Sequence, residues 1–191
     1  MSVNIEEIIP TRDQGGIATN LPVTLKGSSG IVPGAGVFKS IYAGGVAPLA
    51  ATSGTDTTPA DGKVFISAIQ VPHTMSITGI SYLIGSVGGT DKAIAILFDS
   101  DGNVVANSAT AGTTVGTAAN FQRLAFTEAY TAKGPGLYYV GIVMDGTTAR
   151  LRTHAAGDHP TDSVSQTFGT PVAITPPTTF TADEGPIAVL Y

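Results

Sequence analysis

Residues 63–84 read KVFISAIQVPHTMSITGISYLI, and this stretch decides the fold class of the chain. Its first nine residues, Lys63–Val71, carry apolar side chains on both alternating faces. This pattern is typical of a β-strand that lies between two packed layers. Pro72 and His73 then interrupt the apolar pattern, so the stretch predicts two successive strands.

The second of these strands, Met75–Ile84, changes phase at Gly79. Met75 and Ile77 share one face, whereas the apolar side chains beyond the glycine occupy the other face, at Ile80, Tyr82 and Ile84. One extra residue at a glycine shifts the two-residue side-chain period in this way. The sequence therefore predicts a β-bulge at Gly79.

Further short strands are expected after residue 84, separated by turns rich in Gly and Pro. They are predicted at Asp91–Phe98, Val104–Ser108, Phe121–Glu128, Leu137–Met144, Ala149–His154, Ser163–Phe168, Pro171–Ile174 and Pro186–Tyr191. The chain holds 24 Gly and 12 Pro, and no segment sustains the 3.6-residue period of a helix. This spacing predicts an all-β fold, a jelly-roll-like antiparallel β-sandwich.

Two turns and one strand predict an order within this sandwich. Asp99–Asn103 is expected to turn the chain back into Val104–Ser108 as a hairpin. Leu137–Met144 is the most apolar strand, which predicts a central position in its sheet. Asp145-Gly146 is expected to open a second hairpin, into Ala149–His154.

The residues before Lys63 predict a different organisation. Residues 1–36 are expected to form an extended N-terminal arm, because no amphipathic period persists there. Residues 37–62 predict one strand at Val37–Ala43 and then a connecting loop rich in Gly, Thr and Pro. Residues 63–191 form the predicted β-sandwich domain.

The arm carries more apolar side chains than a free tail needs, at Ile5, Ile8, Ile9, Leu21, Val23 and Leu25. Ordering an arm costs roughly 1–2 kcal/mol of backbone entropy per residue, so burying these side chains requires backbone hydrogen bonds as well. We therefore expect the six residues to contact a partner through added strands, with a short strand at Val23–Leu25. A frayed terminus is the alternative that the sequence leaves open.

Composition excludes several classes of function. Nine Lys and Arg against fourteen Asp and Glu give a net charge of −5, which does not supply the basic face that nucleic-acid binding requires. The absence of Cys excludes disulfides and thiolate zinc sites. The densest apolar run, Ala93–Phe98, is too short to span a bilayer, and the first residues lack a secretory signal. We expect a protein made in the cytosol that binds neither nucleic acid nor a membrane.

A basic stripe is the best candidate for a polar contact with a partner. Arg150, Arg152 and His154 occupy one face of a predicted strand, and Leu151 and Thr153 occupy the other. Such a stripe binds carboxylates, phosphates or acidic glycans in other proteins. The alternative is the ordinary solvated face of a half-buried strand.

Two groups of side chains have some features of a metal site. Asp99, Asp101 and Asn103 place oxygen atoms at alternate positions, but Asp-Gly between two strands is also a common hairpin turn. The second group combines two histidines with two acids in one loop, at His154, Asp158, His159 and Asp162. Both segments are interpreted as turns, so the prediction is that the chain holds no metal and no cofactor.

Catalytic signatures are missing from the sequence. There is no Gly-x-Ser-x-Gly elbow, no His-Glu-x-x-His motif and no phosphate-binding Gly-x-x-x-x-Gly-Lys-Ser/Thr loop. Gly34-Ala35-Gly36 lacks the third glycine of a dinucleotide-binding motif. We therefore expect a protein that is not an enzyme.

Residues 121–144 read FQRLAFTEAYTAKGPGLYYVGIVM, and they resemble the penultimate hairpin of many jelly-roll and galactose-binding-like modules. The whole chain is similar in style to virion proteins of tailed bacteriophages: a β-domain rich in Thr, Ala, Gly and Val, poor in charge, without Cys or Trp, behind an extended arm. Within that class it resembles head decoration, cement and head-fibre proteins.

This resemblance implies a structural role on the outside of a capsid. The partners would be the major capsid protein or other virion subunits. The chain would form a trimer or a dimer, and we expect a homotrimer. The protein would be found in the virion, assembled in the host cytoplasm and released by lysis, which agrees with the missing export signal.

A carbohydrate- or receptor-binding module, on a phage fibre or an adhesin, is the second expectation. A glycan binder needs exposed aromatic side chains and polar groups that converge in a groove, whereas a cement protein needs apolar arm contacts and flat interfaces. Tyr130, Tyr138 and Tyr139 are the candidate stacking residues in a chain without Trp. Their location separates the two functions.

Overall fold

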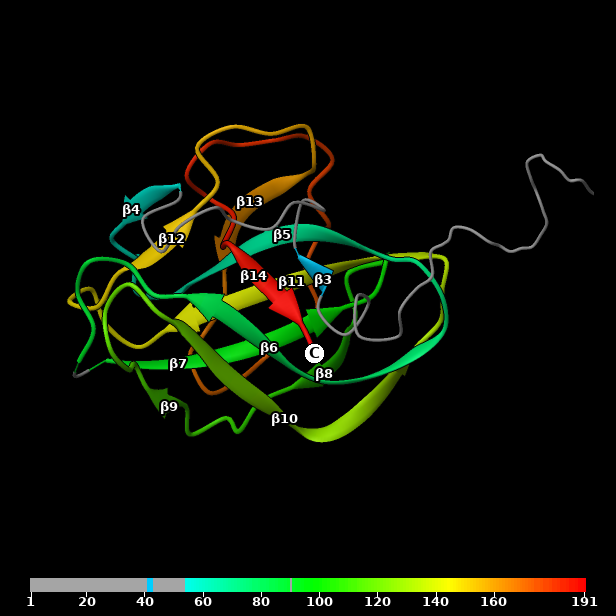
Figure 1. Cartoon of the computed structure of the whole chain (residues 1–191), viewed down its shortest axis with the longest axis horizontal. Coiled ribbons are helices and arrows are strands. Elements are labelled where there is room, and N and C mark those ends of the chain that lie inside the picture. The colour runs from blue at the N-terminus through cyan, green and yellow to red at the C-terminus, as the bar shows by residue number, and fades with distance from the viewer. Residues whose placement is uncertain (1–40, 43–53, 90) are drawn as a thin grey trace, which may run out of the picture. The chain divides into compact units, whose positions relative to one another are not determined.

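The computed structural model describes residues 54–89 and 91–191, together with the backbone of Ile41–Tyr42. Within these residues the chain is all-β without a helix, and every pair of strands is antiparallel. Two sheets pack face to face (Figure 1), so the expected antiparallel β-sandwich is confirmed. The arm at residues 1–36, with its six apolar contact residues, lies outside the described residues.

The larger sheet has the order β13-β5-β11-β7-β8, with β9 also paired to β7. Its strands are β5 (Lys63–Val71), β7 (Lys92–Phe98), β8 (Val104–Asn107), β9 (Thr113–Thr114), β11 (Gly136–Met144) and β13 (Thr161–Ser165). The most apolar strand, β11, lies between β5 and β7, which confirms its predicted central position. The β7–β8 hairpin around Asp99–Asn103 is confirmed as well.

The smaller sheet has the order β10-β6-β14-β3. Its strands are β3 (Ile41–Tyr42), β6 (Met75–Leu83), β10 (Phe121–Ala132) and β14 (Ala188–Leu190). The last strand of the chain, β14, is therefore an interior strand, paired with β6 on one side and β3 on the other. A two-stranded ribbon of β4 (Thr55–Thr57) and β12 (Leu151–Thr153) completes the described fold.

The two sheets enclose the main hydrophobic core. Phe65, Ile69 and Val71 of β5 share one buried cluster with Ile77 and Ile80 of β6. Strands β7, β10, β11 and β14 add buried side chains to the same cluster. Antiparallel strands that each turn one face inward build such a core between two sheets.

A second core lies on the other face of the larger sheet. Val64, Ile66 and Ala68 of β5 are buried there, because their side chains alternate with those of the main core. Phe168 and Ile174, from the segment after β13, pack against this face. The prediction that Lys63–Val71 lies between two packed layers is confirmed, and the outer layer is a non-strand segment.

The phase change at Gly79 is also confirmed, but the predicted position of the bulge in this strand is wrong. Ile77 and Ile80 are both fully buried in the main core, although they have opposite parity along the strand. The register with β10 shifts here: Ala125 opposes Gly79, but Tyr130 opposes Ile77, so the extra residues belong to β10. Gly79 itself exchanges backbone hydrogen bonds with Tyr191, and a Cβ at this position would collide with the Tyr191 ring.

Three local predictions are wrong. Asp145-Gly146 opens no hairpin into Ala149–His154, because β5 and β7 already occupy both edges of β11, and β12 pairs with β4 instead. Pro171–Ile174 is not a strand. Conversely, β4 lies inside the predicted connecting loop.

Separately, the described part of the chain contains no helix suited to crossing a lipid bilayer.

Candidate functional site

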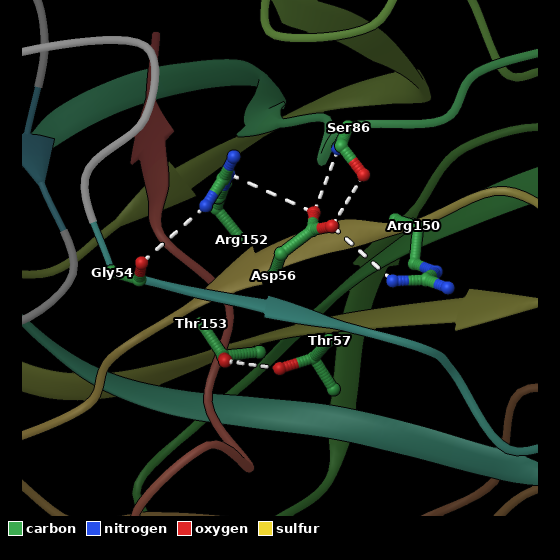
Figure 2. A network of polar contacts seen from close by, with 7 residues as sticks. All are labelled: Gly54, Asp56, Thr57, Ser86, Arg150, Arg152 and Thr153. Carbon is green, nitrogen blue, oxygen red and sulfur yellow. Dashed lines mark hydrogen bonds and ion pairs between the residues drawn. The ribbon is translucent and has the colours of Figure 1, made fainter.

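Arg150 and Arg152 lie on either side of Asp56, at the β4–β12 ribbon (Figure 2). The alternation of β12 produces this arrangement, since Leu151 and Thr153 are fully buried on its inner side. The register of the ribbon pairs Arg152 with Asp56 of β4. Both predicted partner-contact arginines therefore lie next to one carboxylate.

The Asp56 carboxylate is held from three directions (Figure 2). Ser86 donates its backbone N–H to Oδ1 at 2.7 Å and its hydroxyl to Oδ2. Arg150 donates Nη1 to Oδ2 at 3.2 Å, and the Nε atom of Arg152 lies 3.8 Å from Oδ1. Arg152 also donates Nη1 to the carbonyl oxygen of Gly54 at 3.4 Å.

These contacts fix the charge state of Asp56. Burial raises the pKa of the carboxyl, but the two hydrogen bonds from Ser86 and the charges of Arg152 and Arg150 outweigh it and lower the pKa below its ordinary value. Two arginines thus share one internal negative charge. The Arg150 side chain is 37% exposed and that of Arg152 only 11%, so Arg150 is the more available to a partner. Their role as partner contacts stays a prediction.

Replacement of Asp56 by Ala should destabilise the sandwich. The substitution removes the acceptor of Ser86 and Arg150 and the counter-charge of Arg152. Arg152 is the most buried of the three, and leaving a buried charged donor without its partner costs about 1–3 kcal/mol. The melting temperature is expected to fall by several degrees, at about 2–4 °C per kcal/mol. Thermal unfolding measures the effect, with the exposed Asp61→Ala as the matched control. Equal melting temperatures for the two variants would contradict a stabilising role for this network.

The Asp99 carboxylate organises a turn, as predicted. Its Oδ1 atom accepts the backbone N–H groups of Asp101 and Asn103, both at 2.9 Å, and the Asn103 amide adds a third donor. Burial raises the pKa of Asp99, and these hydrogen bonds outweigh it and lower the pKa. Gly102 has φ +87°, which favours glycine at this position of the turn.

The loop that follows β12 brings the rings of His154 and His159 together. Asp158 and Asp162 do not join them in one cluster. The imidazole rings are 4.5 Å apart between centroids and nearly perpendicular, and Phe180 lies 5.8 Å from the His159 ring. Asp158 is exposed, and the Asp162 carboxylate accepts the backbone N–H of Ser163. In the ranges that the structure describes, no group of three or more His, Asp or Glu side chains is placed to hold a metal ion.

Burial of this histidine pair lowers both pKa values. The pKa of His154 falls to about 4, chiefly through burial and then through the neighbouring His159, against an opposing hydrogen bond with the Pro186 backbone. The pKa of His159 is lowered by burial, with an opposing effect from Asp158. Both rings are therefore neutral at pH 7.

Acid should consequently destabilise the fold through this pair. An unfolded His titrates near 6.5, so the stability from a neutral His154 is fully present above pH 6.5 and is lost as the pH falls towards 4. After allowance for solvent screening we expect a loss of about 1–2 kcal/mol. Urea unfolding at pH 7 and pH 4.5 measures it, and His154→Gln should lose less stability over the same interval. The prediction would be contradicted if the free energy of unfolding of His154→Gln fell between pH 7 and pH 4.5 by as much as that of the parent chain.

A groove between β8 and β10 is a second candidate site, and sequence reasoning missed it. Its volume is about 300 Å³, and it is lined by residues 104–107 of β8 and residues 127–130 of β10. Thr127, Glu128 and Ala129 are three successive exposed residues in a strand. This break in the alternation of β10 is visible in the sequence as T-E-A after the apolar Phe126 and is the signal that could have identified the groove.

The tyrosines that could stack on a sugar have unequal locations. Tyr138 and Tyr139, like Tyr82, are buried in the sandwich. Tyr130 is half-buried at the groove, with its ring edge-to-face on Tyr138 at 6.3 Å between centroids. Tyr191 lies under the guanidinium of Arg123, 3.8 Å from the ring centroid.

Comparison of the chain with protein-family models, with curated proteins and with solved structures finds no match.

Proposed function

We propose that this chain is a non-enzymatic structural virion protein, a capsid decoration or cement protein that binds the outer shell. The location of the aromatic side chains is the observation that carries the proposal. Tyr82, Tyr138 and Tyr139 contribute to packing inside the sandwich rather than to a sugar-binding surface. A glycan binder needs exposed aromatic side chains, so the burial of these three tyrosines favours the cement protein.

The surface charges give further support. Asp56 neutralises part of the basic stripe at Arg150 and Arg152, and only 12% of the whole chain is charged. A surface with few charges is weakly protected against contacts with other subunits. We propose the major capsid protein or another virion subunit as the partner, a homotrimer as the assembled form, and the virion as the location.

Co-sedimentation with particles tests this function. The full chain is mixed with virus particles that lack it, from the virus that encodes it, and centrifuged through a sucrose gradient. We expect saturable binding at a fixed number of copies per particle, together with the protein in particles purified from infected cells. Absence from purified particles and no saturable binding would overturn the proposal.

A carbohydrate-binding module is the second candidate, and the groove favours it. Tyr130 offers a ring there, and Asn107, Thr127 and Glu128 place polar groups beside it. Isothermal titration with a panel of host-surface oligosaccharides tests this function. Binding that Tyr130→Ala abolishes and Tyr191→Ala leaves intact would favour the glycan function over the capsid function.

A further inference from the structure

Residues 178–185, here called the strap, run between β13 and β14 without forming a strand. In Figure 1 the strap and the loop after β12 pass close to each other, beside β13. The chain is anchored on both sides of the strap. The Tyr139 hydroxyl donates to the Pro177 carbonyl at 3.4 Å, and the Ser67 hydroxyl donates to the Pro186 carbonyl at 3.0 Å. The strap can therefore open while its two ends stay attached.

His154 holds the strap through its backbone and its side chain. Its backbone N–H donates to the Gly185 carbonyl, and its carbonyl accepts the backbone N–H of Asp183, both at 2.9 Å. The His154 imidazole also forms a hydrogen bond with the backbone of Pro186. One histidine at the end of β12 thus contacts three successive positions at and beyond the end of the strap.

His159 holds the strap through ring packing. Its imidazole contacts the Phe180 ring of the strap at 5.8 Å and the His154 ring at 4.5 Å, in both cases edge to face. A Cβ added at Gly157 would lie 3.0 Å from the His159 ring and 3.2 Å from the Phe180 ring. The loop, the two imidazoles and the strap are therefore in close contact.

This arrangement satisfies neutral imidazoles but not charged ones. A neutral ring has one donor and one acceptor, whereas an imidazolium has two donors. In the ranges that the structure describes, the Nε2 atoms of both His154 and His159 are buried and have no hydrogen-bond partner. A proton added to Nε2 of His154 would be a buried donor without an acceptor, next to a second ring that can also become charged.

The charged side chains on the elements that pack against the pair are Arg152, Asp158, Asp162, Asp183 and Glu184. Asp158 favours the charged form of His159, and Asp162 accepts the backbone N–H of Ser163. The charge of Arg152 is shared with Asp56, at 3.8 Å. Burial outweighs the effect of Asp158, so the pKa of each histidine is lowered, that of His154 to about 4.

We propose that His154 and His159 form an acid-sensitive latch, whose protonation releases the strap from the sandwich while both sheets stay folded. At neutral pH the uncharged pair keeps the strap closed. In acid the two rings take up protons that the closed arrangement does not accommodate, and opening gives them water as the missing acceptor. The latch is a property of the fold and is independent of the proposed function.

The position of the strap explains why its release is local. The strap covers the polar side chains of Ser67 and Thr161, which are fully buried, and a Cβ on Gly185 would collide with both. The second core is covered instead by Phe168 and Ile174, which lie outside the strap. Release of the strap therefore exposes polar groups at β5 and β13 and leaves both hydrophobic cores closed.

Opening should increase as the pH falls from about 6.5 towards 4. A histidine in the open state titrates near 6.5, whereas the pKa of His154 in the closed state is about 4. The open state therefore binds protons that the closed state excludes, and acid favours it. After allowance for solvent screening we expect the open fraction to rise about tenfold between pH 7 and pH 4.5.

Hydrogen exchange in the full chain, measured by NMR, tests the latch. The backbone N–H groups of Thr181 and Asp183 report on the strap, since they donate to the Thr161 hydroxyl and the His154 carbonyl. Val140, between two strands on β11, is the reference. Protection of the strap amides, corrected for intrinsic rates, should fall about tenfold between pH 7 and pH 4.5. About 1 M urea should lower protection at Val140 but not in the strap, because local opening exposes little surface.

Three histidine variants identify the groups responsible. His154→Gln and His159→Gln should each reduce the fall in strap protection. His73→Gln is the matched control, because His73 is exposed between β5 and β6, and it should keep the full tenfold fall. In the unaltered chain, the ring protons of His154 and His159 should titrate at a lower pH than those of His73, and this readout applies even if a variant fails to fold.

Several results would overturn the proposal. Strap amides that match Val140 in protection and urea dependence at both pH values would mean that the strap opens only when the whole sandwich unfolds. Strap protection that does not fall in acid would exclude the latch. A fall that persists in both His154→Gln and His159→Gln, or that disappears in His73→Gln, would assign it to other groups. Titration of all three histidines near pH 6.5 would contradict the proposal as well.

Discussion

Deletion of residues 188–191 is expected to leave no folded sandwich. These residues form β14 and Tyr191, and β14 pairs with β6 and β3 inside the smaller sheet. Ala188 and Leu190 are fully buried, and the deletion also removes the backbone bonds between Tyr191 and Gly79. A buried Leu or Val alone contributes about 1.5–3 kcal/mol, and the exposed edge of β6 adds to the loss. The total approaches the roughly 5–15 kcal/mol that stabilises a typical domain.

Circular dichroism and differential scanning calorimetry measure this result. The shortened chain should show no cooperative thermal unfolding transition at 25 °C or above. Deletion of residues 1–36 is the matched terminal control, because residues 1–40 belong to a unit separate from residues 41–191. We expect this control to keep its β spectrum and a cooperative transition. A folded variant without β14, or an unfolded variant without the arm, would contradict the assignment of the core.

Replacement of Phe98 by Ala should have the largest effect of any single substitution considered. Phe98 is fully buried in the second core, on the outer face of the larger sheet, and a Cβ on Gly141 of β11 would touch its ring. Phe to Ala in a core costs about 3–5 kcal/mol, which lowers the melting temperature of a chain of this size by about 6–20 °C.

Val172→Ala is the control for this substitution, because Val172 belongs to the covering segment but is 51% exposed. A change at an exposed position should stay within about 0.5 kcal/mol. Urea unfolding of both variants gives the two free energies. A loss below about 1 kcal/mol for Phe98→Ala would mean that the segment after β13 does not seal a true core.

The strands that are buried on both faces were the most predictable part of the fold. Lys63–Val71 and Leu137–Met144 are apolar at both parities, and this local property follows directly from their position between two layers. The phase change at Gly79 was also predictable from local sequence, because it depends on the order of apolar and polar side chains along one strand.

Pairing between distant segments was not predictable. In the β4–β12 ribbon the hydroxyl groups of Thr57 and Thr153 are 2.6 Å apart, although 96 positions separate the two residues in the chain. β4 has only three residues, T-D-T, in a stretch with strong turn character. Its strand conformation depends on its partner rather than on its own propensity.

In the candidate sites, too, local features were predictable from the sequence and contacts between distant segments were not. Alternation along the chain correctly placed Arg150 and Arg152 on one face. It did not reveal Asp56, which the neighbouring strand β4 contributes to the same face. The groove was missed because it arises where two sheets end next to each other. Such a site has residues from two edges, and its only trace in the sequence is the interrupted alternation of β10.

The interior position of β14 has a consequence for how the protein is made. Leu190 pairs with Ile80, and the two residues are separated by 190 − 80 = 110 positions. A ribosome adds about 5–20 residues per second, so β6 leaves the exit tunnel roughly 5–20 seconds before its partner. During this interval the nascent chain exposes an apolar strand with a free edge. We expect chaperones that bind nascent chains to associate with β6 and to be released when β14 is inserted.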